Sequence, residues 1–235
     1  MLDIVFTSLE NSWLAVLLTA VTAYLLGSIN SAVIVSRALF KEDVREKGSG
    51  NAGATNMLRN YGKKAAAYTT IGDLLKSIVA VLLGGWLLMT VQMTHAQEIS
   101  VDSLRIVGRY MAGMFCVLGH LYPVFFGFRG GKGVMTSLGM IIILDIRVAA
   151  LCLLTFGIVV ALSRMVSLSS ILAVFVAPFL VYLFGTFVDG HSTLAVGFCT
   201  FMVAVISSIV IFQHRTNVVR IIKGTENKLS FSKKK

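Results

Sequence analysis

Two glycine-rich stretches with cationic side chains carry the groups in this sequence best suited to holding a phosphate. The first is 43–56, DVREKGSGNAGATN, and the second is 127–133, GFRGGKG. Glycine lets the backbone approach a ligand closely, and successive free N–H groups in such a loop form a concave nest for an anion. Nearby cations add charge-assisted contacts. The alternative is an ordinary turn, which two such loops beside apolar segments disfavour.

The candidate phosphate ligands are the cations, glycines and short polar residues of these two loops. Arg45 can bind phosphate through two parallel N–H groups, whereas Lys132 offers a point charge between two glycines. The alternative for both cations is a basic residue that only anchors a loop at the membrane surface. The other loop residues expected to bind phosphate are Gly48, Ser49, Gly50, Asn51, Asn56, Gly130, Gly131 and Gly133.

A third stretch, HRTNVVRIIKGTENK at 214–228, contains a residue able to move a proton. His214 and Asn217 are three residues apart, which places them on one face of a helix. An imidazole exchanges a proton near neutral pH, and an amide can orient a hydroxyl or a carbonyl. The alternatives are a capping or core histidine at 214 and a solvated surface charge at Glu226.

Other polar residues lie inside or at the ends of apolar runs. Asp73 and Lys76 are three residues apart, and we expect a structural ion pair that braces the loop before them. His120 is expected to satisfy backbone groups near the end of its helix. Ser167 and Ser170 are further candidate site residues, although serine is also common at helix ends.

Composition places these residues in a membrane protein. The chain is 56% hydrophobic and 14% charged, against about 45–50% and about 25% in soluble domains. Long uncharged runs predict an all-α polytopic membrane protein, with one domain over 1–235 because its helices must pack together in the bilayer. The net charge of +10 lies beside apolar segments, which suits topology and anionic lipid rather than nucleic acid.

Seven apolar runs are the predicted membrane segments. Two of them, 134–144 and 148–162, are short, because 11 residues rise only roughly 17 Å against a hydrocarbon core of about 30 Å. These two must extend into flanking residues, tilt little, or form a half-crossing hairpin. A polar break is expected at 163–170. The seven runs are 13–35, 65–93, 104–126, 134–144, 148–162, 171–187 and 194–213.

The basic residues predict the orientation of these segments. Most Lys and Arg residues lie in the loop 41–64, the second glycine-rich stretch and the tail 214–235. Positively charged loops face the cytoplasm, so the N-terminus is expected outside and the C-terminus inside. The chemistry-bearing stretches then gather on one face, whereas a transporter distributes polar groups at mid-membrane depth. A permease for organic phosphates and a structural lipid-binding protein are the alternatives to an enzyme.

In three motif regions the sequence resembles the PlsY family of bacterial acyl-phosphate-dependent glycerol-3-phosphate acyltransferases. The regions are GSIN…VSRALF…DVREKGSGNAGATN, GHLYPVFFGFRGGKGV and HRTNVVRIIKGTENK, and the resemblance spans nearly the whole chain. It implies a multi-pass enzyme of the bacterial inner membrane that makes lysophosphatidate from acyl phosphate and glycerol 3-phosphate. Asn30 stands where the family often has proline. The resemblance implies functional roles for Ser36, Arg45, Lys132, His214, Asn217 and Glu226.

The residues agree with a direct acyl transfer that needs no covalent intermediate on the enzyme. Acyl phosphate is already activated, so the enzyme must mainly position groups and stabilise charge. No Ser-His-Asp set is evident, and no histidine has an aspartate five positions later, so direct attack without an acyl-enzyme is expected. The base is either His214 or a substrate phosphate oxygen. Neither cofactor nor metal is expected, and the expected partners are the two substrates, membrane lipids and an enzyme that produces acyl phosphate.

Overall fold

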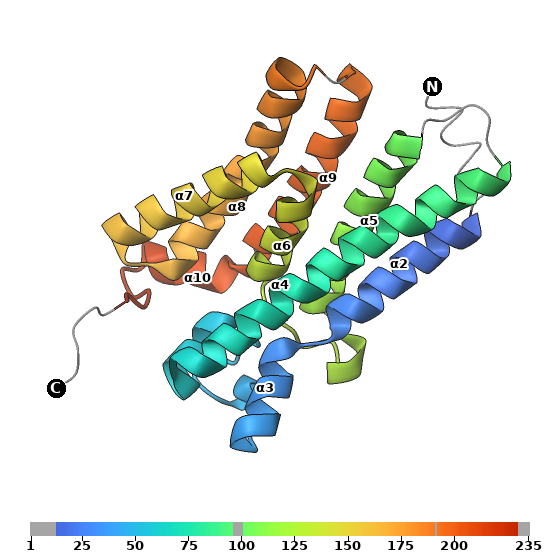
Figure 1. Cartoon of the computed structure of the whole chain (residues 1–235). Coiled ribbons are helices and arrows are strands. Elements are labelled where there is room, and N and C mark those ends of the chain that lie inside the picture. The colour runs from blue at the N-terminus through green and yellow to red at the C-terminus, as the bar shows by residue number, and fades with distance from the viewer. Residues whose placement is uncertain (1–12, 96–100, 191, 230–235) are drawn as a thin grey trace. The chain divides into compact units, whose positions relative to one another are not determined.

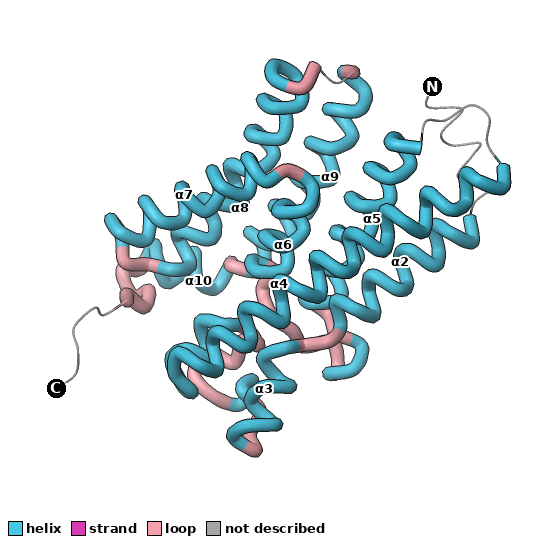
Figure 2. Tube along the Cα trace, in the orientation of Figure 1, coloured by secondary structure: helices cyan, strands magenta, loops and turns pink. Residues whose placement is uncertain are grey.

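The computed structural model describes residues 13–95, 101–190 and 192–229, with side chains described outside 91–104. These ranges are built of helices and short connections, without a strand (Figures 1 and 2). The prediction of an all-α protein is therefore confirmed. The chain divides into two compact units, Met1–Leu144 and Asp145–Lys235. The prediction of a single domain stays a prediction, and each unit is described by itself.

Five helical stretches in the described residues are long and apolar enough to cross a membrane, which agrees with a multi-pass protein. The helix Val134–Leu144 is apolar but shorter. The predicted count of seven segments and their orientation stay predictions. The five stretches are Trp13–Phe40, Ala54–Thr90, Ile146–Ser163, Val166–Val188 and Thr193–Gln213.

The predicted first span is two helices rather than one. Helix α2 covers Trp13–Ser28 and helix α3 covers Ser31–Phe40, and they diverge at the junction (Figure 1). The break follows from Asn30, whose side-chain oxygen accepts from the Val33 N–H at 3.1 Å. Such a bond satisfies one of the free N–H groups of a new helix, so Asn30 starts α3 instead of continuing α2.

The predicted loop 41–64 is wrong beyond its first part, because helix α4 covers Ala54–His95. One residue inside it, Gly62, has the non-helical angles φ 83° and ψ −176°. Glycine tolerates a positive φ without a side-chain clash, so the chain changes direction there between two helical stretches. The loop proper therefore ends before Ala54.

Helix α5, Val101–Leu121, leads to a 3₁₀ turn at Val124–Phe126 and then to α6, Val134–Leu144. The predicted run 104–126 therefore ends as a helix at Leu121, two residues before Pro123. This agrees with the steric bias against helix just before a proline. The 11 residues of α6 match the predicted short run.

Helices α2 and α5 approach each other through glycine, and they run side by side in Figure 1. A methyl group built on Gly27 would lie 2.1 Å from the Cys116 carbonyl oxygen, and one built on Gly119 would lie 2.2 Å from the Tyr24 carbonyl oxygen. Both distances are far inside van der Waals contact. Small residues are typical of helix contacts in membranes, where close backbone packing replaces the hydrophobic drive between helices.

Residues 145–190 and 192–229 of the second unit form three long helices, a π-helical turn and a short final helix. Helix α7 has 18 residues, so the run predicted as 148–162 extends into its flanks and reaches about 27 Å at the usual helical rise. The predicted polar break 163–170 is only the turn before Val166. The elements are α7 Ile146–Ser163, α8 Val166–Leu183, the π turn Phe184–Val188, α9 Thr193–Gln213 and α10 Arg215–Ile222.

Candidate active-site clusters

The first unit brings the two predicted phosphate loops together, and Arg45 joins them. We call residues 41–53 the first loop and residues 122–133 the second loop. The Nη1 atom of Arg45 donates to the carbonyl oxygens of Phe126 at 2.5 Å and Arg129 at 3.2 Å. Two glycine-rich stretches far apart in the sequence are thus in contact within this unit, while their joint binding of phosphate stays a prediction.

Arg45 is also paired with Asp43, a residue that the sequence reading missed. Its Nε and Nη2 donate to the two carboxylate oxygens at 3.0 and 2.7 Å, and Arg37 adds a contact of 2.9 Å. The hydrogen bonds from Arg45 hold the pKa of Asp43 well below its usual range. Four of the five guanidinium N–H groups are committed, so a two-pronged contact with phosphate requires Asp43 to be displaced. The sequence does place Asp43 two positions before Arg45, and that spacing could have predicted the pair.

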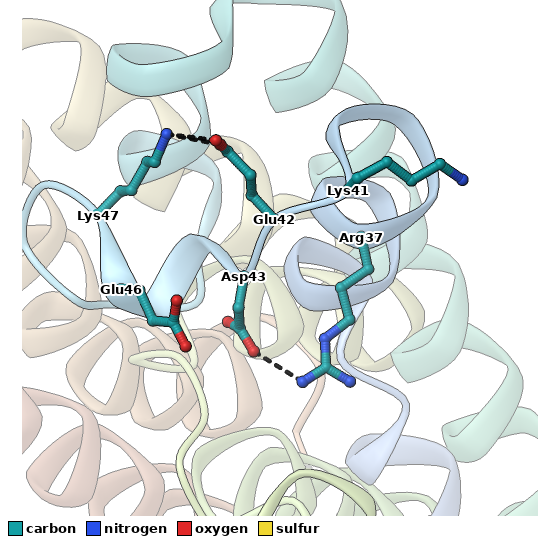
Figure 3. Close-up of a pocket in the computed structure, with 6 residues that line it drawn as sticks. All are labelled: Arg37, Lys41, Glu42, Asp43, Glu46 and Lys47. Atoms are coloured by element: carbon teal, nitrogen blue, oxygen red, sulfur yellow. Dashed lines mark hydrogen bonds and ion pairs between the residues drawn. The ribbon is translucent and has the colours of Figure 1, made fainter.

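A surface hollow of about 520 Å³ opens beside this pair, lined by Arg37, Lys41, Glu42, Asp43, Glu46 and Lys47. Figure 3 shows Lys47 turned to Glu42 and Arg37 turned to Asp43. The corresponding nitrogen–oxygen distances are 2.6 and 2.9 Å. Because its basic and acidic side chains offset one another, this hollow is a poor phosphate site compared with the second loop.

Asn56, a predicted phosphate ligand, organises the first loop instead of facing out of it. It is 2% exposed. Its Nδ2 donates to the carbonyl oxygens of Val44 and Lys47 at 3.1 and 3.0 Å. Its Oδ1 accepts from the Ser49 N–H at 3.1 Å and from Asn60 at 2.9 Å. The amide therefore has its hydrogen-bonding capacity filled by the first loop and by Asn60 of α4.

Other predicted residues of the first loop also have local partners. Ser36 is buried, donates to the Val33 carbonyl and accepts from the Val44 N–H at 3.2 Å, which ties α3 to the loop. The Gly50 N–H donates to Lys47 at 3.0 Å. Gly48 has φ 57°, a conformation that glycine adopts readily. Any phosphate contact of Gly48, Ser49, Gly50 and Asn51 stays a prediction.

The second loop is pinned to the end of α5. The N–H groups of Gly130 and Gly131 donate to the carbonyls of Leu121 at 3.2 Å and His120 at 3.1 Å. A methyl group on Gly130 would lie 2.0 Å from the His120 carbonyl oxygen, so glycine is required there. Lys132 is half-buried, and it lies two residues before Val134, the first residue of α6.

The second unit builds its own cluster around Glu226. The Oε1 atom accepts from Ser167 and from Asn217, each at 2.8 Å, and Oε2 accepts from Arg220 at 2.7 Å. Burial raises the pKa of Glu226, but these three hydrogen bonds outweigh it and the pKa lies below its usual value. The carboxylate is therefore ionised at neutral pH, and it is buried rather than a solvated surface charge.

His214 occupies the junction between α9 and α10 and is 3% exposed. Its Nδ1 lies 2.8 Å from the Val210 carbonyl oxygen. A carbonyl only accepts, so Nδ1 carries a proton, and in the neutral ring the lone pair that a base needs is therefore on Nε2. Ser170, by contrast, donates to Val166 of its own helix, so Ser167 alone of the two serines joins the Glu226 cluster.

Among the described side chains, no group of three or more His, Cys, Asp or Glu residues is arranged to hold a metal ion. The two clusters instead offer what an acyl transfer between phosphorylated molecules needs. The first unit supplies a loop cation on a pinned backbone. The second supplies a buried imidazole at the junction of α9 and α10, and a buried Asn217 amide on α10 that donates to the Glu226 carboxylate.

Comparison with known proteins agrees with this chemistry. The sequence model of the family described as glycerol-3-phosphate acyltransferase matches residues 17–224. A glycerol-3-phosphate acyltransferase of Clostridioides difficile (strain 630) is 37% identical over 217 residues, covering 92% of this chain and 97% of the relative. Crystal structures of PlsY, an integral membrane glycerol 3-phosphate acyltransferase, match in two forms at 35% identity and 92% coverage of this chain. The glycerol 3-phosphate form has a TM-score of 0.74 with 96% of its chain covered, and the lysophosphatidic acid form has 0.72 with 95%.

Proposed function

The chain belongs to the glycerol-3-phosphate acyltransferase family, and from that premise we propose how its residues transfer a fatty acyl group to glycerol 3-phosphate in phospholipid synthesis. The observation that best supports this proposal is the similarity, over nearly the whole chain, to a PlsY structure in its glycerol 3-phosphate form. A permease or a purely structural membrane protein has no comparable support.

We propose acyl phosphate as the donor and direct transfer as the reaction. A hydroxyl oxygen of glycerol 3-phosphate attacks the carbonyl carbon of the acyl phosphate. The new ester C–O bond forms, the C–O bond to the phosphate group breaks, and inorganic phosphate leaves. The hydroxyl proton passes to His214 Nε2 or to a phosphate oxygen. Phosphate is a good leaving group, so positioning and charge stabilisation suffice.

Within the first unit, Lys132 is the proposed phosphate ligand. The pinned backbone of Gly130 and Gly131 presents its ammonium at the start of α6, where the positive end of the helix dipole adds to the charge. Arg45 has two proposed tasks, holding the loops together and meeting phosphate through the N–H that remains. Ser36 and Asn56 hold the first loop in place through hydrogen bonds to its backbone.

Within the second unit, His214 and Asn217 act on the acceptor substrate. His214 orients the attacking hydroxyl and takes its proton. Glu226 is a positioning residue, because its carboxylate fixes the Asn217 amide and the Arg220 guanidinium in one arrangement. Ser167 of α8 also donates to this carboxylate. Ser170 donates to Val166 of its own helix instead and is not proposed as a site residue.

The donor preference tests this proposal. We expect rapid turnover with acyl phosphate and little with acyl-CoA, because the two loops offer compact phosphate sites. Purified protein would be assayed for lysophosphatidate with either donor at matched chain length. Equal or faster turnover with acyl-CoA would rule out the proposed donor. Sealed vesicles that accumulate glycerol 3-phosphate without forming product would favour a permease.

We further propose seven membrane segments in a bacterial inner membrane, with the N-terminus outside and the C-terminus in the cytoplasm. The distribution of Lys and Arg supports this orientation. In a variant free of Cys116, Cys152 and Cys199, a single cysteine at Arg129 should react with an impermeant reagent only after the membrane is opened. Labelling of intact cells from outside would reverse the orientation. The acyl phosphate then arrives on the cytoplasmic side, from an enzyme that produces it.

A further inference from the structure

A buried cluster of three ionisable side chains adjoins the second loop in the first unit. Asp73 and Lys76 of α4 and His120 of α5 are 2%, 7% and 3% exposed. The Lys76 ammonium lies 3.0 Å from Asp73 Oδ1 and 2.9 Å from His120 Nδ1. It also donates to the Ile29 carbonyl oxygen at 2.9 Å. Buried charges are costly even when paired, and ionisable groups in membrane segments are commonly functional.

The three contacts fix the orientation of the His120 ring. An ammonium group has donors and no acceptor, so Nδ1 of His120 accepts from Lys76 and the ring proton is on Nε2. Asp73 balances the charge of Lys76, and its Oδ1 lies 3.5 Å from His120 Nδ1. One edge of the ring is therefore held by α4, and the Nε2 edge is left for another neighbour.

That neighbour is Gly131 of the second loop. A methyl group built on Gly131 would lie 2.2 Å from His120 Nε2 and 2.8 Å from the Ala52 carbonyl oxygen. The ring edge and the backbone of the first loop thus flank Gly131 closely. The Gly131 N–H in turn donates to the His120 carbonyl at 3.1 Å. Because Lys132 is the next residue, the position of the His120 ring limits where its backbone can lie.

We propose that Asp73, Lys76 and His120 form a positioning unit that holds the second loop where Lys132 can meet a substrate phosphate. The inference rests on the proposed function of Lys132. The three residues do not touch substrate, and they act through Gly131. The sequence predicted the ion pair between Asp73 and Lys76 within α4. In the structure this pair also holds the His120 ring, and the ring in turn lies against Gly131.

The discriminating variant is His120→Asn. Asparagine keeps an acceptor near the place of Nδ1 for the Lys76 ammonium, but it lacks the ring edge that meets Gly131. We expect kcat/KM to fall by about 10²-fold, the size associated with a displacement of about 1 Å at a catalytic group. His120→Gln, whose longer side chain reaches toward Gly131, should recover part of the loss. Unchanged kcat/KM in His120→Asn would overturn the inference.

A matched control is Thr69→Val on the same helix. Thr69 is also buried, and its hydroxyl donates to the Ala65 carbonyl at 2.9 Å. Valine removes that buried hydrogen bond and keeps the shape of the side chain. We expect Thr69→Val to retain wild-type kinetics. A loss equal to that of His120→Asn would mean that any buried polar change in the helices impairs the enzyme, and the specific link to Gly131 would be refuted.

A double-mutant cycle separates this inference from the proposed role of Lys132. If His120 acts through Lys132, His120→Asn should cost little in a Lys132→Ala background. Full activity of Lys132→Ala would defeat the proposed role of Lys132 as a phosphate ligand, and with it the premise of this inference. An impaired Lys132→Ala enzyme in which His120→Asn still costs its full factor would support the role of Lys132 and defeat the positioning unit.

The same link is testable from the loop side should His120→Asn not accumulate as folded protein. Gly131→Ala leaves the three charged residues in place and brings a methyl group against the ring. We expect a large loss of kcat/KM in the wild-type background and a smaller loss where His120→Ala has removed the ring. An equal fold-loss in both backgrounds would show that the ring does not hold Gly131.

Discussion

Replacing His214 with alanine should reduce kcat by about 10²–10⁴, the usual range for removing a general acid–base. The expectation comes from its tautomer, because Nδ1 donates to the Val210 carbonyl and the neutral ring then carries its lone pair on Nε2. Protonated imidazole cannot accept a proton, so the wild-type rate should also fall at acidic pH. Steady-state rates across pH, with both substrates varied, measure the effect.

His214→Asn is the matched control for this change. Its side-chain amide can keep the hydrogen bond to the Val210 carbonyl, so the junction between α9 and α10 should remain intact while the proton acceptor is gone. We expect His214→Asn to be stable to heat and nearly as slow as His214→Ala. Substantial activity in His214→Gln would instead favour a substrate phosphate as the base. A fully active His214→Ala enzyme would remove α10 from the reaction.

Replacing Lys132 with alanine should reduce kcat/KM by about 10- to 150-fold, which corresponds to roughly 1.5–3 kcal/mol for a lost charge-assisted hydrogen bond. Lys132→Arg should also be poor, because a planar guanidinium differs from a point charge and must fit between two glycines. Inhibition by inorganic phosphate should weaken in parallel with the rate. That inhibition constant distinguishes a phosphate ligand from a residue that only folds the loop.

Arg129→Ala provides the comparison for Lys132→Ala in the same loop. Arg129 is exposed, and the contact that the structure records for it uses its backbone carbonyl, which alanine retains. Loss of a cation there should leave the kinetics close to wild type. Wild-type kinetics in Lys132→Ala, or equal losses in both variants, would mean that Lys132 serves only as a positive anchor at the membrane surface.

The apolar runs predicted most of the helices. The errors occurred where polar residues determine the point at which a helix begins. The run 13–35 does not show that Asn30 caps a new helix, because the cap depends on a side-chain bond to Val33 rather than on hydropathy. The loop 41–64 was predicted too long, since Ala54–Tyr61 is a polar helical stretch. The sequence of Ala54–Tyr61 lacks the continuous apolarity by which the membrane segments were predicted, so this stretch was assigned to the loop.

The residue types at the two clusters were predictable, but their partners were not. Asn56 was expected at phosphate, yet its amide is used within the first loop. Glu226 was named through family resemblance, although the alternative of a solvated charge was as good from sequence alone. The contacts of Glu226 with Ser167 and Arg45 with Phe126 join residues far apart in the chain. Spacing along a sequence carries no information about such pairs.

The close approach of α2 to α5 affects how genetic data on this enzyme should be interpreted. A growth-based scan of all substitutions would score Gly27 and Gly119 as intolerant, much like Lys132, although neither glycine is a proposed phosphate ligand. The cause would be a lost backbone contact between two helices, which lowers the amount of assembled enzyme rather than its turnover. Measuring protein abundance beside growth would separate these glycines from the residues of the reaction.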